Sequence, residues 1–155
     1  MRIGRDGTWY YRGSAIQRKP LVTLFSSVLK RDESGQFWLE TPVERGRIDV
    51  DDAPFVAVAL DVSGSGESQT LIFRTNLDET VTAGSDHPIR VETDAETGEP
   101  SPYIHTRDGL DALIARSVYY QLADLAVCWQ DDDVLGVWSS GIFFELGRAT
   151  DDDAN

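Results

Sequence analysis

The chain has 155 residues, with 14 Lys or Arg against 27 Asp or Glu and a formal net charge of −13. This length suits one domain or two small, closely packed ones, and 41% hydrophobic with 26% charged residues is typical of a globular chain. The negative charge argues against general binding of duplex nucleic acid, which requires cationic side chains against the phosphates.

The basic residues gather at the N-terminus. Residues 1–31 contain seven of the 14 basic residues and only one of the 27 acidic residues. Two interpretations stay open: this segment packs against the acidic remainder of the chain, or it presents a surface to an anion.

The first third of the chain predicts one helix among short strands. Thr8–Arg12 is an aromatic strand between glycine turns. Leu21, Leu24, Phe25 and Val28 have the spacing of an apolar helix face, which predicts a helix over Pro20–Lys30. Further strands are expected at 36–40, 47–50 and 55–62, and the last of them reads as buried on both faces.

The remainder of the chain follows a Gly/Ser-rich stretch at Ser63–Ser68. Apolar residues at helical spacing predict a second helix that begins near Asp108 and ends at Gln130–Asp133. Strands are expected on both sides of that helix, at 69–74, 80–83, 89–92, 102–106, 134–138 and 142–146.

The order of these elements predicts an α+β fold. Short turns join most strands, which favours mostly antiparallel sheets with one helix in each half. We expect two tandem related subdomains at residues 1–64 and 65–150, followed by a disordered acidic tail at 151–155. The repeat of Arg5-Asp6-Gly7 as Arg107-Asp108-Gly109 is compatible with a duplication.

The single cysteine, Cys128, excludes an intramolecular disulfide and is expected to be a small buried hydrophobe. The N-terminus lacks the apolar region of a signal peptide. The longest apolar run, Phe55–Leu60, is far too short for a membrane span. A cytoplasmic location is therefore the default expectation.

Motifs for catalysis, metals and cofactors are missing from the sequence. No serine has the G-x-S-x-G context of a nucleophile elbow, and no phosphate-binding loop is present. His87 and His105 are too few for a histidine-rich metal centre, and Asp49–Asp52 lacks the glycine and distal glutamate of a calcium loop. We expect no metal and no cofactor, and a hydrolytic enzyme is the least favoured class, although 27 acids leave carboxylate pairs open.

A series of short motifs nevertheless resembles a known family. They are Asp6-Gly7-Thr8-Trp9, Leu24–Leu29, Thr41–Glu44, Asp52–Phe55, Phe73–Asn76, Pro102-Tyr103 and Gly136–Gly141. In this order, over residues 3–147, the chain resembles the uncharacterised bacterial family called domain of unknown function 1285. The resemblance implies two tandem α+β subdomains from a duplication, the second superficially like a pleckstrin-homology (PH) fold. It also implies a candidate ligand site in the cleft between them and suggests signalling with a nucleotide-like ligand, but no known reaction.

Cationic and aromatic residues near the two predicted helix starts form the candidate site. If the halves face each other, basic side chains and helix N-termini would line one cleft suited to an anion, and aromatic rings would offer stacking surfaces. The alternative is that these arginines pair with acidic residues of the second half. The candidate ligand-binding residues are Trp9, Tyr11, Arg18, Lys19, Tyr103, Arg107, Arg116, Tyr119 and Trp138.

Two functions are compatible with these sequence features. The first is a non-catalytic signalling protein that binds a small anionic, nucleotide-like ligand between the subdomains. The alternative is a protein–protein interaction adaptor that uses the PH-like subdomain, through the exposed face of the second helix and the strand Ile142–Leu146.

Overall fold

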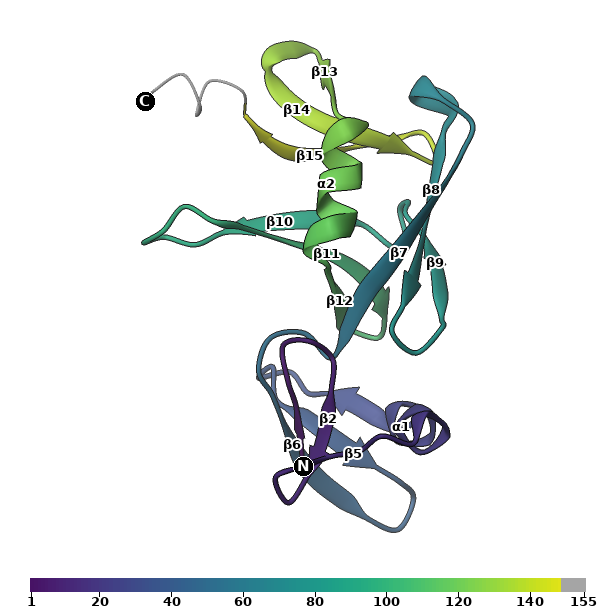
Figure 1. The fold of residues 1–155 in the computed structure, drawn as a ribbon, viewed down its shortest axis with the longest axis vertical. Helices are drawn as coiled ribbons and strands as arrows, with labels where there is room; N and C mark the ends of the chain where they lie inside the picture. The colour runs from purple at the N-terminus through teal and green to yellow at the C-terminus, as the bar shows by residue number, and fades with distance from the viewer. Residues whose placement is uncertain (149–155) are drawn as a thin grey trace.

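The computed structural model describes residues 1–148, with only the backbone described at residues 131 and 132. The predicted tail at 151–155 lies outside this range. Two sheet-rich subdomains follow one another along the chain and are joined at Asp51–Pro54, where β6 ends and β7 begins (Figure 1). The predicted α+β fold of two tandem, mostly antiparallel subdomains is confirmed.

The N-terminal subdomain is a six-stranded sheet in the order β3-β2-β1-β6-β5-β4. Its strands pair antiparallel, except that β1 runs parallel to β6. The elements are β1 (Arg2–Ile3), β2 (Trp9–Tyr11), β3 (Ser14–Ala15), α1 (Lys19–Ser26), β4 (Leu29–Arg31), β5 (Phe37–Glu40) and β6 (Arg45–Val50).

Helix α1 is shorter than the apolar spacing predicted. Pro20 lies in its first turn as expected, but the helix ends at Ser26 instead of Lys30. Leu29 pairs with Leu39 of β5 and is fully buried, so the backbone hydrogen bonds of the sheet replace a further helical turn.

The C-terminal subdomain contains a second six-stranded sheet in the order β10-β11-β12-β7-β8-β9, with only β12 and β7 parallel. Its elements are β7 (Phe55–Ser63), the 3-10 turn η1 (Gly66–Ser68), β8 (Thr70–Thr75), β9 (Thr80–Thr82), β10 (Ile89–Thr93), β11 (Pro100–Arg107) and β12 (Leu110–Ile114). Because β7 belongs to this sheet, pairing favours a subdomain boundary before Phe55, earlier than the expected boundary at residue 64.

Helix α2 (Arg116–Asp124) leads into a three-stranded antiparallel sheet of β13 (Val127–Trp129), β14 (Asp131–Ser139) and β15 (Ile142–Arg148). This C-terminal sheet lies at the end of the molecule far from the N-terminal subdomain (Figure 1). Buried Ser139 ties it to the second sheet, because its hydroxyl accepts from the Leu71 amide at 2.9 Å and donates to the Ala83 carbonyl at 2.8 Å.

The helix expected from Asp108 is wrong over its first part. Residues Leu110–Ile114 form a strand, and all five are buried. Leu110, Leu113 and Ile114 match the spacing of an apolar helix face, but a central strand buried on both faces is apolar throughout and satisfies the same spacing. This segment forms a strand because it pairs with β7 on one side and with β11 on the other.

Two predicted burials also differ from the structure. Strand β7 is buried only at Phe55–Ala57, and Val58 and Val62 are exposed. Cys128 is exposed on β13, because α2 ends at Asp124 instead of continuing past Cys128, and the chain then forms the first strand of the C-terminal sheet.

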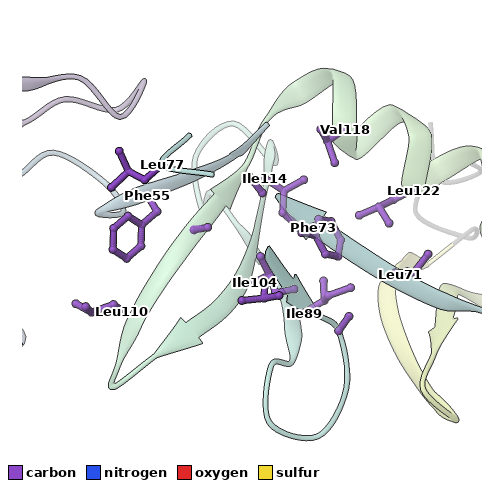
Figure 2. Close-up of a cluster of buried hydrophobic side chains, with 14 of the residues drawn as sticks. Phe55, Leu71, Phe73, Leu77, Ile89, Ile104, Leu110, Ile114, Val118 and Leu122 are labelled. Atoms are coloured by element: carbon purple, nitrogen blue, oxygen red, sulfur yellow. The ribbon is translucent and has the colours of Figure 1, made fainter. Parts of the chain in front are cut away.

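The hydrophobic core of the C-terminal subdomain lies between its sheet and α2. Phe73 and Ile104 point from the strands toward Val118 and Leu122 of the helix (Figure 2). The buried cluster continues into the N-terminal subdomain, where Trp9 is 1% exposed. This continuity fixes the two subdomains against each other and so positions the pockets at their junction.

Candidate functional site

The larger of two pockets at the subdomain junction has a volume of about 620 Å³. Arg5, in the turn after β1, contributes from the N-terminal subdomain. The other lining residues come from the start of β11, the end of β12 and the first turns of α2, and they include Glu99, Ser101, Leu113, Arg116, Tyr119 and Tyr120. We call this space the α2 pocket.

The start of α2 gives the pocket its electrostatic character. Ala115 is the N-cap residue, so no side chain caps the helix, and no acidic residue lies in the first turn. The first amide groups of an α-helix have no partner within the helix, and their positive end favours anions.

Arg116 adds a full positive charge at this helix start. Its side chain is exposed, and it forms no ion pair with any residue in 1–148. Arg5 is held loosely, because its Nε lies 3.5 Å from Oδ2 of Asp52 and its side chain is 69% exposed. Among the described residues, Glu99 is the only acidic side chain in the lining, so cations outnumber acids there.

Two tyrosines supply ring surfaces to the α2 pocket. Tyr119 is half-buried, and burial raises the pKa of its hydroxyl, which therefore stays neutral. Tyr120 is 60% exposed. Stacking surfaces beside a guanidinium group suit a planar ligand that carries an anionic group.

The smaller junction pocket, of about 330 Å³, is also polar, but its three carboxylates, those of Asp52, Glu92 and Asp111, all have partners. Arg90 bonds to Asp111 and to Glu92, each at 2.7 Å. Burial lowers the pKa of Arg90, but the hydrogen bonds to both carboxylates outweigh it and raise the pKa. Arg31 donates to the Gly109 carbonyl at 3.1 Å.

Tyr103 and Asp52 lie together in this smaller pocket. The Tyr103 hydroxyl donates to Asp52 Oδ1 at 2.6 Å, and the Arg90 guanidinium covers its ring at 4.5 Å. Burial, together with the hydrogen bond and charge of Asp52, raises the pKa of Tyr103 to about 12. Asp111 also lies 3.1 Å from Nδ1 of His105.

The structure does not bring the nine candidate residues into one cleft. Arg116 and Tyr119 share the α2 pocket, whereas Tyr103 lines the smaller one. Lys19 forms an ion pair with Asp78 at 2.8 Å, and Arg107 lies 3.8 Å from Glu79. These two cations therefore pair with acidic residues of the second half of the chain, which was the alternative to ligand binding.

The remaining candidates lie elsewhere. Arg18 is the exposed N-cap residue of α1 and lines neither junction pocket. Trp9 is in the core, Tyr11 is exposed on β2, and Trp138 packs against Trp129 in the C-terminal sheet. None of these four lines the α2 pocket.

Sequence reasoning missed Arg5 in the α2 pocket and Asp52, Arg90 and Asp111 in the smaller one. Asp111 did carry a signal, because it is the only charged residue within the apolar run Leu110–Ile114. A charge in such a run indicates a buried partner. The positions of Arg5, Asp52 and Arg90 depend on strand pairing and left no comparable signal.

Within the described part of the chain, no group of three or more His, Cys, Asp or Glu side chains is placed to hold a metal ion. None of the helices found there has the length and apolar character required to cross a membrane.

Family and structure comparisons agree with this architecture. The family described as "Domain of unknown function (DUF1285), N-terminal domain" matches residues 1–53, and "Protein of unknown function (DUF1285), C-terminal domain" matches residues 54–146. No curated protein matches the chain.

Two crystal structures share the fold. A DUF1285 family protein from Silicibacter pomeroyi DSS-3 has 50% sequence identity and a TM-score of 0.91, with 99% of this chain and 82% of that chain covered. A DUF1285 family protein from Shewanella baltica OS155 has 25% identity and a TM-score of 0.61, with 79% and 89% covered. The resemblance seen in the sequence motifs is thus confirmed over both subdomains, and the chain belongs to the DUF1285 family.

Proposed function

We propose that this protein is a non-catalytic binding protein for a small anionic, nucleotide-like ligand, which it holds in the α2 pocket as part of a signalling response. The observation that carries the proposal is Arg116: in a chain with a net charge of −13, this exposed arginine has no acidic partner among residues 1–148. It stands at an uncapped helix start that opens into a pocket.

The residues around Arg116 suggest how such a ligand would be held. A phosphate would accept hydrogen bonds from the Arg116 guanidinium and from the first amides of α2. Arg5 would approach the same group from the other subdomain. A planar ring would stack on Tyr119 or Tyr120, against the apolar wall that includes Leu113.

The test is thermal unfolding with a panel of nucleotides, sugar phosphates and inorganic phosphate at low salt. A ligand at 100 times its Kd adds about 2.7 kcal/mol to stability, which for a chain of this size raises Tm by about 5–10 °C. Arg116→Ala should weaken binding at least tenfold, since it removes a charge-assisted contact of about 1.5–3 kcal/mol.

Arg18→Ala is the matched control. Arg18 is also an exposed arginine at a helix start without an ion pair in residues 1–148, but it lines neither junction pocket. Its removal should leave binding unchanged. If no compound in the panel shifts Tm and native mass spectrometry detects no ligand, the proposed function is wrong.

The second candidate function is the protein–protein adaptor. The observation that favours it is that β15, which contains the strand predicted to make the contact, is an edge strand of the C-terminal sheet. An edge strand offers backbone groups to an added strand. This function depends on the PH-like character of the second subdomain, which stays a prediction, as do the duplication and the cytoplasmic location. A pulldown that recovers one stoichiometric partner with the wild-type protein, but not with a proline substitution in β15, would support the adaptor function.

A further inference from the structure

A third pocket, far from the subdomain junction, lies on the C-terminal sheet. It has a volume of about 260 Å³. Its lining residues come from all three strands and the turn between the first two, and none of them lines a junction pocket: Trp129, Gln130, Val134, Phe143, Glu145 and Arg148. We call it the β13 pocket.

The alternation of side chains along β15 places this pocket on the outer face of the sheet. Phe144 and Leu146 are buried in the core, so Phe143 and Glu145 project to the opposite side. Trp138 of β14 pairs directly with Phe143. Strand β13 brings Trp129 next to both rings.

The aromatic rings of this face are held in position by one another. Trp129 lies 5.3 Å from Phe143 between ring centroids, at an interplanar angle of 45°. Trp138 meets both rings edge to face, at 4.8 and 5.4 Å. Gly136 permits this arrangement, because a Cβ atom at that position would lie 2.6 Å from the Phe143 ring.

Trp129 contributes a partly exposed ring to the pocket. Six other aromatic rings in residues 1–148 have an arginine guanidinium above them, at 3.7 to 5.7 Å from the centroid. Trp129 is 39% exposed, and neither it nor Phe143 is covered in this way by any cation of the described residues. A ring of this type attracts a cation to its face, and tryptophan does so most strongly.

Glu145 supplies a negative charge beside the rings. Its side chain is 50% exposed, and its only charged partner in the described residues is Arg148, whose Nε lies 3.7 Å from Oε1. That separation is longer than a hydrogen bond, so the carboxylate keeps its acceptor sites. The pocket therefore combines aromatic rings without a cation above them, one carboxylate, and the Arg148 guanidinium, which lines the same pocket but is not hydrogen-bonded to Glu145.

We propose that the β13 pocket binds a methylated ammonium cation, with Trp129 and Phe143 as its aromatic walls and Glu145 as the counter-charge. A methylated ammonium group needs few hydrogen-bond acceptors, whereas a lysine ammonium must satisfy three donors and a guanidinium five. A pocket with aromatic rings and one carboxylate therefore suits a methylated ammonium group. The same group occurs in free quaternary amines and in methylated lysine side chains of proteins, and both would use this chemistry.

The experiment is a titration of the full chain followed by the tryptophan indole N–H signals in NMR spectra. The first probe is tetramethylammonium chloride, with sodium chloride at equal ionic strength as the control. The Trp129 signal should shift in a saturable manner, while that of Trp38, in the N-terminal subdomain, should not. Nα-acetyl-trimethyllysine amide and choline, compared at equal concentration, distinguish a protein side chain from a free amine as the source.

Three comparisons decide the outcome. The neutral isostere 3,3-dimethylbutanol should bind at least fivefold more weakly than choline, since it lacks the charge. Glu145→Gln should weaken choline binding about threefold to tenfold, and Trp129→Leu should abolish it. Glu145→Gln changes one exposed side chain, so it remains informative if Trp129→Leu fails to fold. Absence of a saturable shift, or equal affinity for the neutral isostere, would overturn the proposal.

Discussion

The hydroxyl of Tyr103 donates a 2.6 Å hydrogen bond to the Asp52 carboxylate and so joins β11 to the segment that links the two subdomains. The Asp52 side chain is only 18% exposed, and its second oxygen faces Arg5. Other contacts across the junction are also polar, such as Lys19 with Asp78. The orientation of the subdomains, and with it the shape of both junction pockets, therefore depends on specific polar pairs as well as on the shared core.

Tyr103→Phe should lower the free energy of unfolding by about 1–3 kcal/mol, because it leaves a mostly buried carboxylate without its donor. Urea denaturation followed by circular dichroism measures the change. Tyr119→Phe is the control, since Tyr119 is half-buried, whereas Tyr103 is buried, and forms no hydrogen bond through its hydroxyl in residues 1–148. Equal stability of wild type and Tyr103→Phe would contradict the structural role of this bond.

Stability should also fall in alkaline solution. Burial and Asp52 raise the pKa of Tyr103 to about 12, from 10.0 in the unfolded chain. The folded state therefore holds this proton more tightly, and its contribution is complete below pH 10 and lost as the pH rises toward 12. Tyr119 acts in the same direction through burial. Urea midpoints between pH 9 and 11 should fall less steeply in Tyr103→Phe than in wild type; parallel profiles would count against this assignment.

Gly7→Ala should destabilise the protein more than Gly13→Ala. Both glycines have a left-handed backbone, with φ of +88° and +81°, so each substitution carries a similar backbone cost of about 1–2 kcal/mol. At Gly7 the new Cβ would also lie 2.7 Å from Nδ2 of Asn76, across the subdomain junction, whereas nothing lies within 4 Å at Gly13. We expect a further loss of about 1–3 kcal/mol, measured by urea denaturation. Equal losses of stability in the two variants would contradict this expectation, because they would show that Asn76 moves to make room for the new Cβ atom.

Arg107→Ala should reduce stability without reducing ligand affinity. Its guanidinium donates to the Ser26 carbonyl at 3.1 Å across the junction and lies over the Phe55 ring at 5.6 Å. We expect a loss of about 1–3 kcal/mol, against less than about 0.5 kcal/mol for Arg18→Ala. Thermal unfolding and titration with a ligand of the α2 pocket measure the two effects. If Arg107→Ala instead lost ligand affinity with unchanged stability, Arg107 would be a ligand-binding residue.

Asp32→Asn should weaken the protein at neutral pH and matter less in acid. Asp32 accepts hydrogen bonds from Trp38 Nε1, from the hydroxyl and amide of Ser34 and from the Gln36 amide, and these hold its pKa well below the usual range. The stabilisation is present above the unfolded pKa of about 4 and is lost as the pH falls through the lower folded value.

The measurement for Asp32 is the urea midpoint at pH 7, 4 and 3 for wild type and variant. The difference between them should shrink as the pH falls. Glu33→Gln is the control, because the exposed Glu33 side chain forms no hydrogen bond or ion pair within residues 1–148. A difference that stays constant across this range would contradict the role of the carboxylate charge.

The sequence by itself determined the fold class, most strands and the family. Apolar runs and turn residues are local signals, and they located strands such as Phe55–Ser63 to within a residue or two. It also placed Arg116 and Tyr119 beside each other, because residues three apart share a helix face. The basic N-terminal segment is evident from composition alone.

Tertiary structure decided the features that depend on long-range pairing. Leu110–Ile114 became a strand because it lies between β7 and β11 in the sheet. Residues of the basic N-terminal segment have different surroundings in the structure. Lys19 forms an ion pair with Asp78 across the junction, whereas Arg5 lines the α2 pocket. The spacing of residues along the chain does not show which surfaces of the two subdomains meet, because burial and ion pairing arise only when the sheets pack. The nine candidate residues therefore lie at several sites, and only the tertiary structure shows this.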